Sequence, residues 1–327
     1  SEALKRLGPQ VAQAELLAAQ YDEVVANPPY MGGAGMNALL KSFARSNFSD
    51  AKSDLFACFI ERAFLLAKNA GQSALVTMHS WMFLSSFQKM RERLLREKSI
   101  RTMAHLGARA FGSISGEVVQ TTAYVAKNNR PSSYKPVCFR LLDGGEDEKR
   151  IALVSGKNRF DNTAQHEFAK VPGSPVAYWV TPSMRDGFVK GAPLGESLRP
   201  VVGLQTGSND SFVRRWSEVD WSNAATGLAS REESVESKRK WFPYNKGGEV
   251  RRWYGNQELI VNWQDDGREI RAFGTEGGGR PRSRPQNTDF YFLEGITWAD
   301  ITTQSFAARH TPCGFVFDVK GSSGFPG

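Results

Sequence analysis

Asn27-Pro28-Pro29-Tyr30, which follows the apolar run Glu23-Val24-Val25-Ala26, is the stretch that decides the fold of this chain. Each proline removes a backbone donor, fixes φ and pushes the preceding residue into an extended conformation, so neither a strand nor a helix can continue. The run therefore predicts a strand that stops at a stiff loop with an amide before it and a phenol after it. Open α/β sheets bind ligands at the carboxyl ends of their strands. The stretch is a candidate ligand loop, with an ordinary strand-ending turn as the alternative.

The composition is that of a folded protein large enough for two or three domains, with 327 residues, 40% hydrophobic and 11% aromatic. No apolar stretch approaches the ~20 residues needed to cross a bilayer, and residues 1–20 lack the basic start and apolar centre of a signal peptide. We therefore expect a cytoplasmic protein with no membrane partner. The formal net charge of +8 is compatible with a polyanionic partner.

Cysteine and histidine spacing predicts no metal site. The cysteines Cys58, Cys138 and Cys313 lie far apart and form no C-x-x-C pair, which argues against a disulfide framework and against a cysteine-based zinc site. The histidines show no H-E-x-x-H or similar ligand spacing, so we interpret all four as structural or surface residues: His79, His105, His166 and His310.

The first part of the chain alternates helix and strand patterns, which predicts a mostly parallel sheet with helices on its faces. Glycines in Met31–Met36 lack the spacing of a phosphate-binding loop, and no clear helix start follows them. Ser53-Asp54 offers N-capping side chains for the next helix, which we expect Ala70-Gly71 to end. The expected helices are 9–20, 55–69 and 87–96, and the expected strands are 23–26, 73–78, 100–106 and 117–126.

The alternation breaks near Lys127. Residues 128–133 are rich in turn formers, and residues 143–150 form a charged, glycine-containing stretch that we interpret as a loop. Beyond Val201 the chain is rich in Trp, Arg and Gly, which predicts a second domain of irregular β elements and loops.

The loop Asn27–Tyr30 suits chemistry on a planar amine. The Asn27 side-chain oxygen and the Pro28 carbonyl can both accept hydrogen bonds from an exocyclic NH2, which draws the nitrogen out of planarity and frees its lone pair. Tyr30 can stack on the ring that bears the amine. Such a nitrogen becomes nucleophilic without a strong base, as attack on an electrophilic methyl group requires.

Asn27-Pro28-Pro29-Tyr30 resembles the catalytic motif of amino-group methyltransferases that use S-adenosylmethionine, chiefly the adenine-N6 DNA methyltransferases. Glutamine methyltransferases that act on proteins, and some RNA enzymes, share the motif. The segments 52–56, 71–82 and 91–95 resemble those that follow it in the adenine-specific enzymes. The long form Asn27–Gly33, together with residues 80–87, is most similar to PglX, the adenine methyltransferase family of BREX phage-defence systems. The likeness runs through most of the chain.

The resemblance implies that Asn27 and Pro28 hold the amine of an adenine flipped out of the duplex and that Tyr30 stacks on it, with Pro29 as a further residue of the catalytic motif. Phe111 corresponds in position to a second aromatic that related enzymes offer to the base. The equally weighted alternative is that Phe111 is a core residue. The resemblance also implies that Asp54, Leu55 and Phe56 help to form the adenine pocket of the cofactor. For Asp54, a helix cap is the other interpretation.

The glycine-rich cofactor loop of the family normally precedes the Asn-Pro-Pro-Tyr strand, yet the 26 residues before Asn27 contain no G-x-G turn. We therefore expect this chain to be an internal piece of a longer methyltransferase that binds S-adenosylmethionine weakly by itself.

The second domain carries two runs that suit a nucleic-acid surface, residues 238–254 and residues 280–284. Six cations and five aromatics surround one acid, Glu249, within residues 238–254, and the alternative is a solvated charged loop beside core tryptophans. Residues 203–210 and 296–298 resemble segments of target-recognition domains. The candidate DNA-binding residues are Lys238, Arg239, Lys240, Lys246, Arg251, Arg252, Arg280, Arg282 and Arg284.

Together these patterns predict an α/β protein: the C-terminal half of a Rossmann-like methyltransferase domain (residues 1–145), a connector (146–200) and a mixed α/β target-recognition domain (201–327). The expected function is methyl transfer from S-adenosylmethionine to adenine N6 in double-stranded DNA, with other defence-system proteins as further partners. The alternatives are the modification part of a combined restriction-modification enzyme, or a DNA-binding or phage-sensing module without activity.

Overall fold

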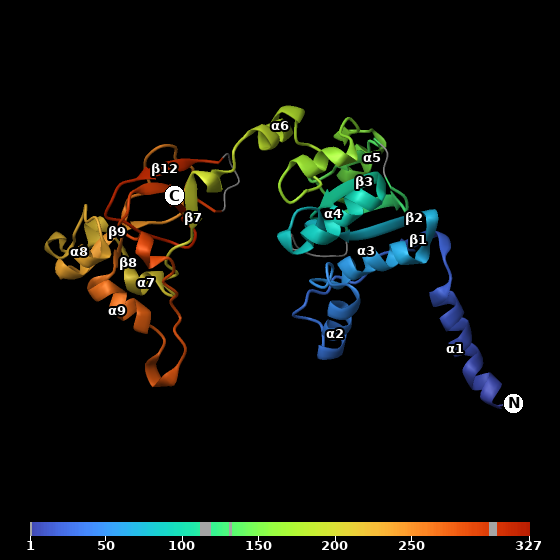
Figure 1. Ribbon diagram of the computed structural model, residues 1–327, viewed down its shortest axis with the longest axis horizontal. Helices are drawn as coiled ribbons and strands as arrows, with labels where there is room; N and C mark the ends of the chain where they lie inside the picture. Colours follow the sequence, from blue (N-terminus) through green and yellow to red (C-terminus); the bar gives the residue numbers. More distant parts are fainter. Residues whose placement is uncertain (1, 112–118, 131–132, 301–305) are drawn as a thin grey trace. The chain divides into compact units, whose positions relative to one another are not determined.

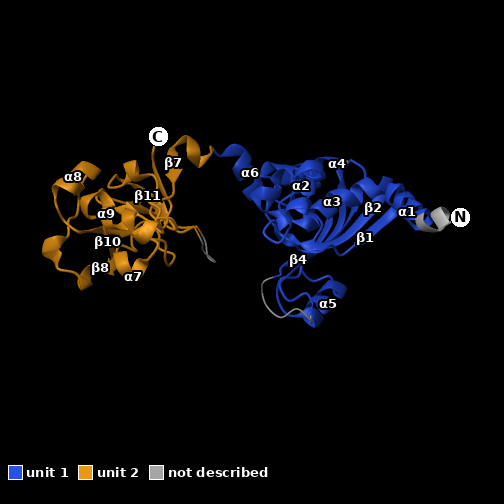
Figure 2. Ribbon diagram, turned by 90° about the horizontal axis from the view of Figure 1, so that it is seen from below, with its two compact units in different colours: residues 1–191 blue, residues 192–327 orange. Residues whose placement is uncertain are grey.

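The computed structural model describes residues 2–111, 119–130, 133–300 and 306–327, with the backbone alone for residues 2–6. The chain divides into two compact units, Ser1–Gly191 (unit 1) and Ala192–Gly327 (unit 2), shown in different colours in Figure 2. Each unit has its own hydrophobic core. Among the described residues, no helix combines the length and the apolar character needed to cross a bilayer.

Unit 1 is built on a six-stranded sheet with helices packed against it (Figure 1). Its strands are β1 (Tyr21–Ala26), β2 (Ala67–Met78), β3 (Ser99–Gly107), β4 (Thr121–Lys127), β5 (Val137–Arg140) and β6 (Arg159–Phe160). Its helices are α1 (Glu2–Ala18), α2 (Ala38–Asn47), α3 (Leu55–Leu66), α4 (Gln88–Glu97), α5 (Glu146–Val154) and α6 (Pro182–Lys190), and its 3-10 turns are η1 (His79–Met82), η2 (Ser85–Phe87) and η3 (Gln165–Lys170). The expected α/β class is confirmed.

The strand order is β1-β2-β4-β3-β5-β6. β1 pairs with β2 and β3 pairs with β5 in parallel, whereas β4 runs antiparallel to both β2 and β3, and β6 antiparallel to β5. The strands β1, β2, β3 and β5 therefore share one direction, as expected for a mostly parallel sheet, and β4 and β6 are the exceptions. A strand that returns directly from β3 needs no crossover helix, so β4 enters the sheet between β2 and β3 in the opposite direction.

A bulge in β2 lets the backbone of β1 approach closely. α3 ends at Leu66 and β2 begins at Ala67, so the expectation that Ala70-Gly71 ends the helix is wrong. Ala70 has φ of 63°, and a Cβ on Gly71 would lie 2.9 Å from the carbonyl oxygen of Asp22. Only glycine leaves room for that carbonyl, and the register between β1 and β2 shifts at the same point.

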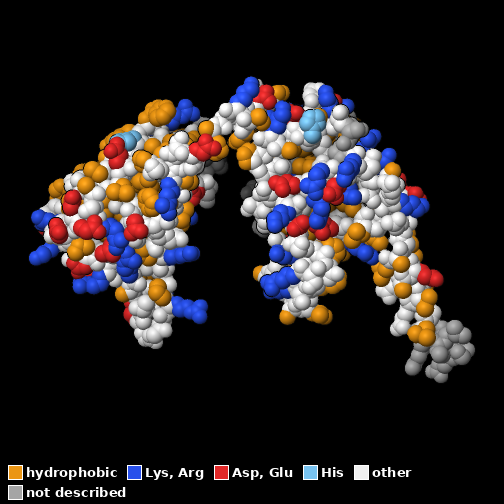
Figure 3. All heavy atoms as spheres, viewed as in Figure 1, with side chains coloured by type: hydrophobic (Ala, Val, Ile, Leu, Met, Phe, Trp, Pro, Cys, Tyr) orange, Lys and Arg blue, Asp and Glu red, His pale blue; other side chains and the backbone are white. Residues whose placement is uncertain are grey.

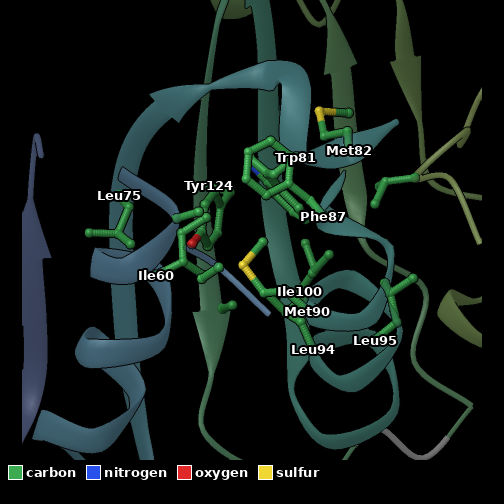
Figure 4. Packing of buried hydrophobic residues seen from close by; sticks show 14 of the residues in the cluster. Ile60, Leu75, Trp81, Met82, Phe87, Met90, Leu94, Leu95, Ile100 and Tyr124 are labelled. Carbon is green, nitrogen blue, oxygen red and sulfur yellow. The ribbon is translucent and has the colours of Figure 1, made fainter. Parts of the chain in front are cut away.

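The core of unit 1 lies between the sheet and helices α3 and α4. Figure 4 shows Trp81 beside Tyr124 and Phe87, and it also labels Ile60 of α3, Leu75 of β2, and Met90 and Leu94 of α4 from the same cluster. The Trp81 side chain is fully buried, and its indole nitrogen donates to Thr77 Oγ1 at 3.1 Å. Burying a side chain of this size contributes about 2 kcal/mol or more, so the segment after β2 is firmly held.

The guanidinium of Arg91 ties α4 to two distant segments. Its NH1 donates to the carbonyls of Trp81 and Leu84, and its Nε donates to those of Gly173 and Ser174. Arg91 is 1% exposed, so these carbonyls replace the water that its charge has lost. Segments more than 80 residues apart in the sequence are thereby fixed to the same helix.

Two helices differ from the sequence-based expectation. α2 follows the glycine-rich segment directly, because the Asn37 side chain caps it by accepting from Leu40 N at 2.8 Å. α5 occupies most of the stretch 143–150 that we expected to be a loop. The carboxylate of Glu148 accepts from Gly145 N at 3.0 Å, and three acidic residues in the first turn complement the helix dipole.

The other expected elements of unit 1 agree more closely with the structure. α1 begins earlier than the expected Pro9, and α4 and β3 match their expected ranges to within a residue or two. β4 begins at Thr121, and the first residues expected for that strand, Glu117 and Val118, lie outside the described residues.

Unit 2 contains two four-stranded sheets, in the orders β13-β9-β10-β8 and β12-β11-β14-β7. The strands are β7 (Leu198–Val201), β8 (Val213–Arg215), β9 (Trp241–Asn245), β10 (Leu259–Asn262), β11 (Gly295–Trp298), β12 (Ala308–Thr311), β13 (Val316–Phe317) and β14 (Ser323–Pro326). The α-helices are α7 (Asn209–Phe212), α8 (Arg231–Glu236) and α9 (Gln264–Ala272), which gives the mixed α/β class expected for this region.

The segment that begins at Gly203 threads through the core of unit 2. A Cβ on Gly203 would lie 1.9 Å from the Phe317 carbonyl oxygen, so no larger residue fits there. The next residue, Leu204, is fully buried and donates its N–H to the same carbonyl at 2.7 Å. The Tyr244 hydroxyl donates to Asp318 at 2.5 Å beside it. The segment expected to belong to a target-recognition domain is therefore a structural part of unit 2.

Candidate active site at the carboxyl end of β1

The loop Asn27–Tyr30 lies where β1 ends, as the sequence predicts. β1 pairs in parallel with β2, with Ala26 opposite Leu75, so the loop emerges beside Val76. Asn27 and Pro29 are exposed and Pro28 is buried. The buried proline fixes the backbone, while the Asn27 amide remains available to a ligand at the edge of the sheet.

Tyr30 is half-buried and held from two sides. Its hydroxyl lies 3.4 Å from Asn27 Oδ1 and 3.4 Å from the Val76 carbonyl oxygen, both long for hydrogen bonds to a hydroxyl. Its ring meets Phe56 edge to face, with ring centroids 6.3 Å apart. Burial raises the pKa of Tyr30, so the phenol stays protonated at neutral pH. The ring is oriented by Phe56, while its hydroxyl is only loosely engaged.

Asp54 links the loop to α3. Its Oδ1 accepts from Phe56 N at 3.3 Å, which caps the helix, and from Met31 N at 3.0 Å, which anchors the residue after Tyr30. Leu55 is half-buried, and its N–H donates to the Met31 carbonyl at 3.0 Å. Phe56 is fully buried against Tyr30 and Phe87. Its side chain supports Tyr30 from within the core, whereas Asp54 and Leu55 border the loop.

Phe111 lies on the segment between β3 and β4. It is half-buried, and its neighbours in the sequence, Gly112 and Ser113, lie outside the described residues. The segment rejoins the sheet at Gln120, whose carbonyl accepts from the backbone N–H of His79 at 2.9 Å. The residue before β4 is therefore hydrogen-bonded to the residue that directly follows β2.

Sequence reasoning missed a histidine pair at the same edge. His79 Nδ1 and His105 Nε2 lie 2.7 Å apart, and His105 Nδ1 lies 3.1 Å from the Tyr178 hydroxyl. Burial lowers the pKa of both imidazoles, that of His105 to about 4. No ligand spacing marks these residues, but both stand at or near the carboxyl end of a predicted strand, and that position could have indicated them.

An apolar recess of about 630 Å³ borders the loop. It is lined by the sheet strands, by Leu153 of α5 and by Asn27. Val25 of β1, which also lines the recess, is 76% exposed. Asn27 is therefore a polar group at the margin of an apolar surface of the sheet.

All nine candidate DNA-binding residues lie in unit 2. Lys238 and Arg239 are exposed on the turn after α8, and Lys240 lies 3.8 Å from the Glu269 carboxylate. Arg251 and Arg252 are exposed before β10, and Lys246 is half-buried. The remaining three, after α9, are also exposed: Arg280, Arg282 and Arg284.

The aromatics of the same runs have two different roles. Phe242 and Tyr244 are fully buried core residues of β9. Trp253 and Tyr254 are 78% and 67% exposed, and Trp253 has φ of 72°. Its backbone is fixed by hydrogen bonds to Ala308 and His310 of β12. Figure 3 shows Lys and Arg interspersed with Asp and Glu over one face of unit 2.

Residues 8–111 match the Eco57I restriction-modification methylase family. The chain is 50% identical over 325 residues to the adenine-specific methyltransferase BrxX of Escherichia coli O9:H4 (strain HS), covering 99% of this chain and 26% of BrxX. It is 40% identical over 316 residues to the adenine-specific methyltransferase PglX of Lacticaseibacillus casei (strain Zhang), covering 94% of this chain and 26% of PglX. The chain thus spans about a quarter of the length of these relatives.

Among solved structures, the fold resembles the Type IIL restriction-modification enzyme MmeI in complex with DNA, with a TM-score of 0.56 and 11% identity over 93% of this chain and 40% of that one. A nuclease-deletion mutant of the Type ISP enzyme LlaGI with a DNA substrate mimic gives a TM-score of 0.50 and 10% identity, over 97% of this chain and 36% of that one. These likenesses show a shared fold. The resemblance predicted from Asn27–Tyr30 is confirmed, because nearly the whole chain is homologous to a quarter of the adenine-specific methyltransferases BrxX and PglX.

Proposed function

We propose that this chain is part of a site-specific DNA methyltransferase that modifies the N6 amine of an adenine flipped out of the duplex, and that the modification marks host DNA for phage defence. The observation that carries the proposal is the loop Asn27–Tyr30 at the carboxyl end of β1, with its exposed amide and its half-buried phenol. The homology to proteins named adenine-specific methyltransferases supports it.

Asn27 and Pro28 hold the amine. The Asn27 Oδ1 and the Pro28 carbonyl oxygen each accept one N6 hydrogen, which favours a pyramidal nitrogen with an available lone pair. Within the described part of the chain, Tyr30 is the only side-chain hydrogen-bond partner of Asn27, and the contact is 3.4 Å long. An adenine amine at the usual distance of about 2.9 Å would displace it readily.

Tyr30 stacks on the base, and Phe111 is the proposed second aromatic. Flipping exposes both faces of the adenine, and each aromatic contact recovers part of the lost stacking energy, about 1–3 kcal/mol per base. Phe56 keeps the Tyr30 ring in a fixed orientation through the edge-to-face contact. The ring is therefore placed before the base arrives.

The residues around α3 fit S-adenosylmethionine as the methyl donor. Asp54 uses Oδ1 for two backbone N–H groups, and among the described residues no donor contacts its Oδ2. A free carboxylate oxygen fits the exocyclic amine of the cofactor's adenine ring, and Leu55 offers apolar contact beside it. When bound, the cofactor supplies an electrophilic methyl group on sulfur, which becomes a neutral thioether as the adenine nitrogen loses a proton to solvent.

Unit 2 supplies the proposed DNA contacts. The nine cations neutralise phosphates, and Arg side chains offer bidentate donors to phosphates or guanine. Trp253 and Tyr254 add exposed aromatic surface between the cationic segments. Double-stranded DNA is the proposed partner, and other proteins of the defence system are further proposed partners.

The test is adenine methylation by the full-length protein and by two Asn27 variants. Asn27→Ala removes the acceptor, and we expect methylation to fall by at least about 100-fold. Asn27→Asp keeps an acceptor oxygen of the same reach and retains more activity than the alanine variant. Asn47→Ala, which changes an asparagine on α2, is the matched control and should act as the unmodified protein does. Modified adenine is counted by sequencing host DNA.

Equal methylation by the unmodified protein and Asn27→Ala would refute the assignment of the loop. DNA binding without methylation by the unmodified protein would favour a module that binds DNA without activity. Methylation accompanied by DNA cleavage would favour a combined restriction-modification enzyme.

A further inference from the structure

Three side chains from separate parts of unit 1 form a continuous hydrogen-bonded chain. The Tyr178 hydroxyl lies 3.1 Å from His105 Nδ1, and His105 Nε2 lies 2.7 Å from His79 Nδ1. Tyr178 and His105 are 2% and 3% exposed, while His79 is half-buried. Phe83 and Trp179 pack against the imidazoles, with ring centroids 5.5 to 6.1 Å apart. The chain therefore runs from the core to the surface at the strand ends.

The two histidines lie on either side of the start of β4. β4 separates β2 from β3 in the sheet, with His105 of β3 opposite Thr122 and Met78 of β2 opposite Thr121. A side-chain contact between His79 and His105 consequently crosses the amino-terminal end of β4. The backbone N–H of His79 also donates to the carbonyl of Gln120, the residue before β4.

The direction of the chain follows from the phenol. Burial raises the pKa of Tyr178, so its hydroxyl keeps its proton, and among the described residues His105 is its only hydrogen-bond partner. A buried donor without an acceptor costs about 1–3 kcal/mol, so Tyr178 donates to His105 Nδ1. Neutral His105 then carries its own proton on Nε2 and donates to His79 Nδ1. Neutral His79 in turn carries its proton on Nε2.

Protonation would break this order. A proton added to His79 Nδ1 would face the Nε2–H of His105, and reversing the chain would leave the Tyr178 hydroxyl proton without an acceptor. The charged groups that act on His105 are Arg140 of β5 and Lys149 of α5, and both oppose a further positive charge. No described carboxylate acts on either imidazole. The surroundings therefore favour the doubly neutral pair.

We propose that Tyr178, His105 and His79 form a neutral hydrogen-bonded chain that fixes the end of β3, from which residues 108–110 lead to Phe111, for the flipped base. The inference rests on the proposed function, in which Phe111 stacks on the adenine. His79 is a positioning residue, because its side chain acts through His105 of β3. Loss of the chain lets the end of β3 shift, and a displacement of about 1 Å at a reacting centre can cost about 100-fold in rate.

The test is the pH dependence of methylation by the full-length protein on host DNA, between pH 5 and pH 8.5. In the unmodified protein, kcat should fall towards low pH as the His79–His105 pair takes up a proton. This fall is the acidic limb of the pH profile. His79→Gln supplies an amide oxygen that accepts from His105 and does not titrate, so it should keep kcat within about 3-fold at pH 8 and flatten the limb. His79→Leu has no acceptor and should lose about 10-fold or more in kcat at every pH, with a smaller change in KM for DNA.

Tyr178→Phe removes the proton that sets the direction while keeping the ring. In this variant the forward chain leaves His105 Nδ1 without a donor, so reversal costs less than in the unmodified protein, and the midpoint of the acidic limb should move to higher pH. His166→Gln changes an exposed histidine of unit 1 and is the matched control, with no expected change in the limb. An acidic limb that is the same in the unmodified protein, His79→Gln and Tyr178→Phe would overturn the proposal, and so would full activity of His79→Leu.

A direct measurement separates this inference from the proposed function. Nitrogen-15 chemical shifts of the histidine rings at pH 7.5 report which nitrogen carries the proton. We expect Nε2–H on both His79 and His105, and Nδ1–H on either would overturn the chain. An inactive unmodified protein would count against the proposed function alone, because the ring-nitrogen result does not depend on activity.

Discussion

The phenolic oxygen of Tyr30 lies 3.4 Å from Oδ1 of Asn27, the atom proposed to receive the adenine amine. The two catalytic candidates therefore hold each other loosely at the end of β1. Tyr30→Phe removes the competing hydroxyl but keeps the stacking ring, so we expect kcat/KM to change by less than about 3-fold, since the lost hydrogen bond is long. Tyr30→Ala removes the ring and should cost about 10- to 100-fold. Steady-state methylation measures both, and equal losses in the two variants would contradict a stacking role.

The two oxygens of Asp54 allow its helix-capping role to be separated from its cofactor role. Asp54→Ala removes the cap and the anchor of Met31, so the free energy of unfolding should fall by about 1–2 kcal/mol. Asp54→Asn keeps an acceptor oxygen for both N–H groups and should unfold close to the unmodified protein. It should bind S-adenosylmethionine more weakly, since the charge is lost. Urea unfolding measures the free energy of unfolding, and calorimetry measures the affinity for S-adenosylmethionine. Unchanged affinity in Asp54→Asn would show that Asp54 acts only as a helix cap.

Gly71 tests the close approach of β1 and β2. In Gly71→Ala, the new Cβ would lie 2.9 Å from the Asp22 carbonyl oxygen, so we expect a loss of about 1–3 kcal/mol in unfolding free energy. Gly8→Ala is the matched control, because no atom lies within 4 Å of its Cβ position in α1. The control should be neutral or stabilising by up to about 1 kcal/mol. A neutral Gly71→Ala would show that β1 can move away from the bulge.

The stability of unit 1 should depend on pH through His105. Burial first, then His79 and two cations, lower its pKa to about 4 from the usual 6.5. The unfolded chain therefore binds more protons than the folded one between these values, and stability is lost as the pH falls from about 6.5 towards 4. His105→Gln should flatten this part of the curve. Thermal unfolding at pH 7.5, 6.0 and 5.0 measures how stability changes with pH. The same change in His105→Gln would show that another group causes the pH dependence.

Arg251 tests the DNA surface of unit 2. If it contacts a phosphate, Arg251→Ala should lower the slope of log affinity against log salt by about 1. Arg268→Ala is the matched control, since the Arg268 guanidinium lies 3.0 Å from the Asp265 carboxylate on the same unit and is already neutralised. Binding of the full-length protein to duplex DNA at several salt concentrations provides the slopes. A control slope that falls as much as that of Arg251→Ala would indicate a general charge effect.

Local chemistry explains which parts of unit 1 the sequence could predict. The Pro28-Pro29 step ends β1, and the Asp54 carboxylate caps α3, so both features follow from a few adjacent residues. Asn37 and Glu148 provide similar local indications for α2 and α5, which sequence reasoning overlooked. The direction of β4 depends on pairings with β2 and β3, and no adjacent residue specifies those partners.

The candidate site was predictable only in part for the same reason. Asn27 to Tyr30 are contiguous, so their chemistry can be recognised as a motif. The support that Phe56 gives to Tyr30, and the chain from Tyr178 to His79, join residues far apart in the sequence. In unit 2, the burial of Phe242 and Tyr244 and the exposure of Trp253 depend on which strands pair, which charge and aromatic counts cannot distinguish.

The acceptors of Arg91 bear on how this chain matures during synthesis. α4 leaves the ribosome long before Gly173 and Ser174, and until they arrive the buried guanidinium lacks the carbonyl partners they supply. The contacts of Arg91 with Trp81 and Leu84 can form in the meantime, whereas Gly173 and Ser174 reach α4 only later. We therefore expect unit 1 to reach its final packing around Arg91 only after the chain has been translated beyond Ser174.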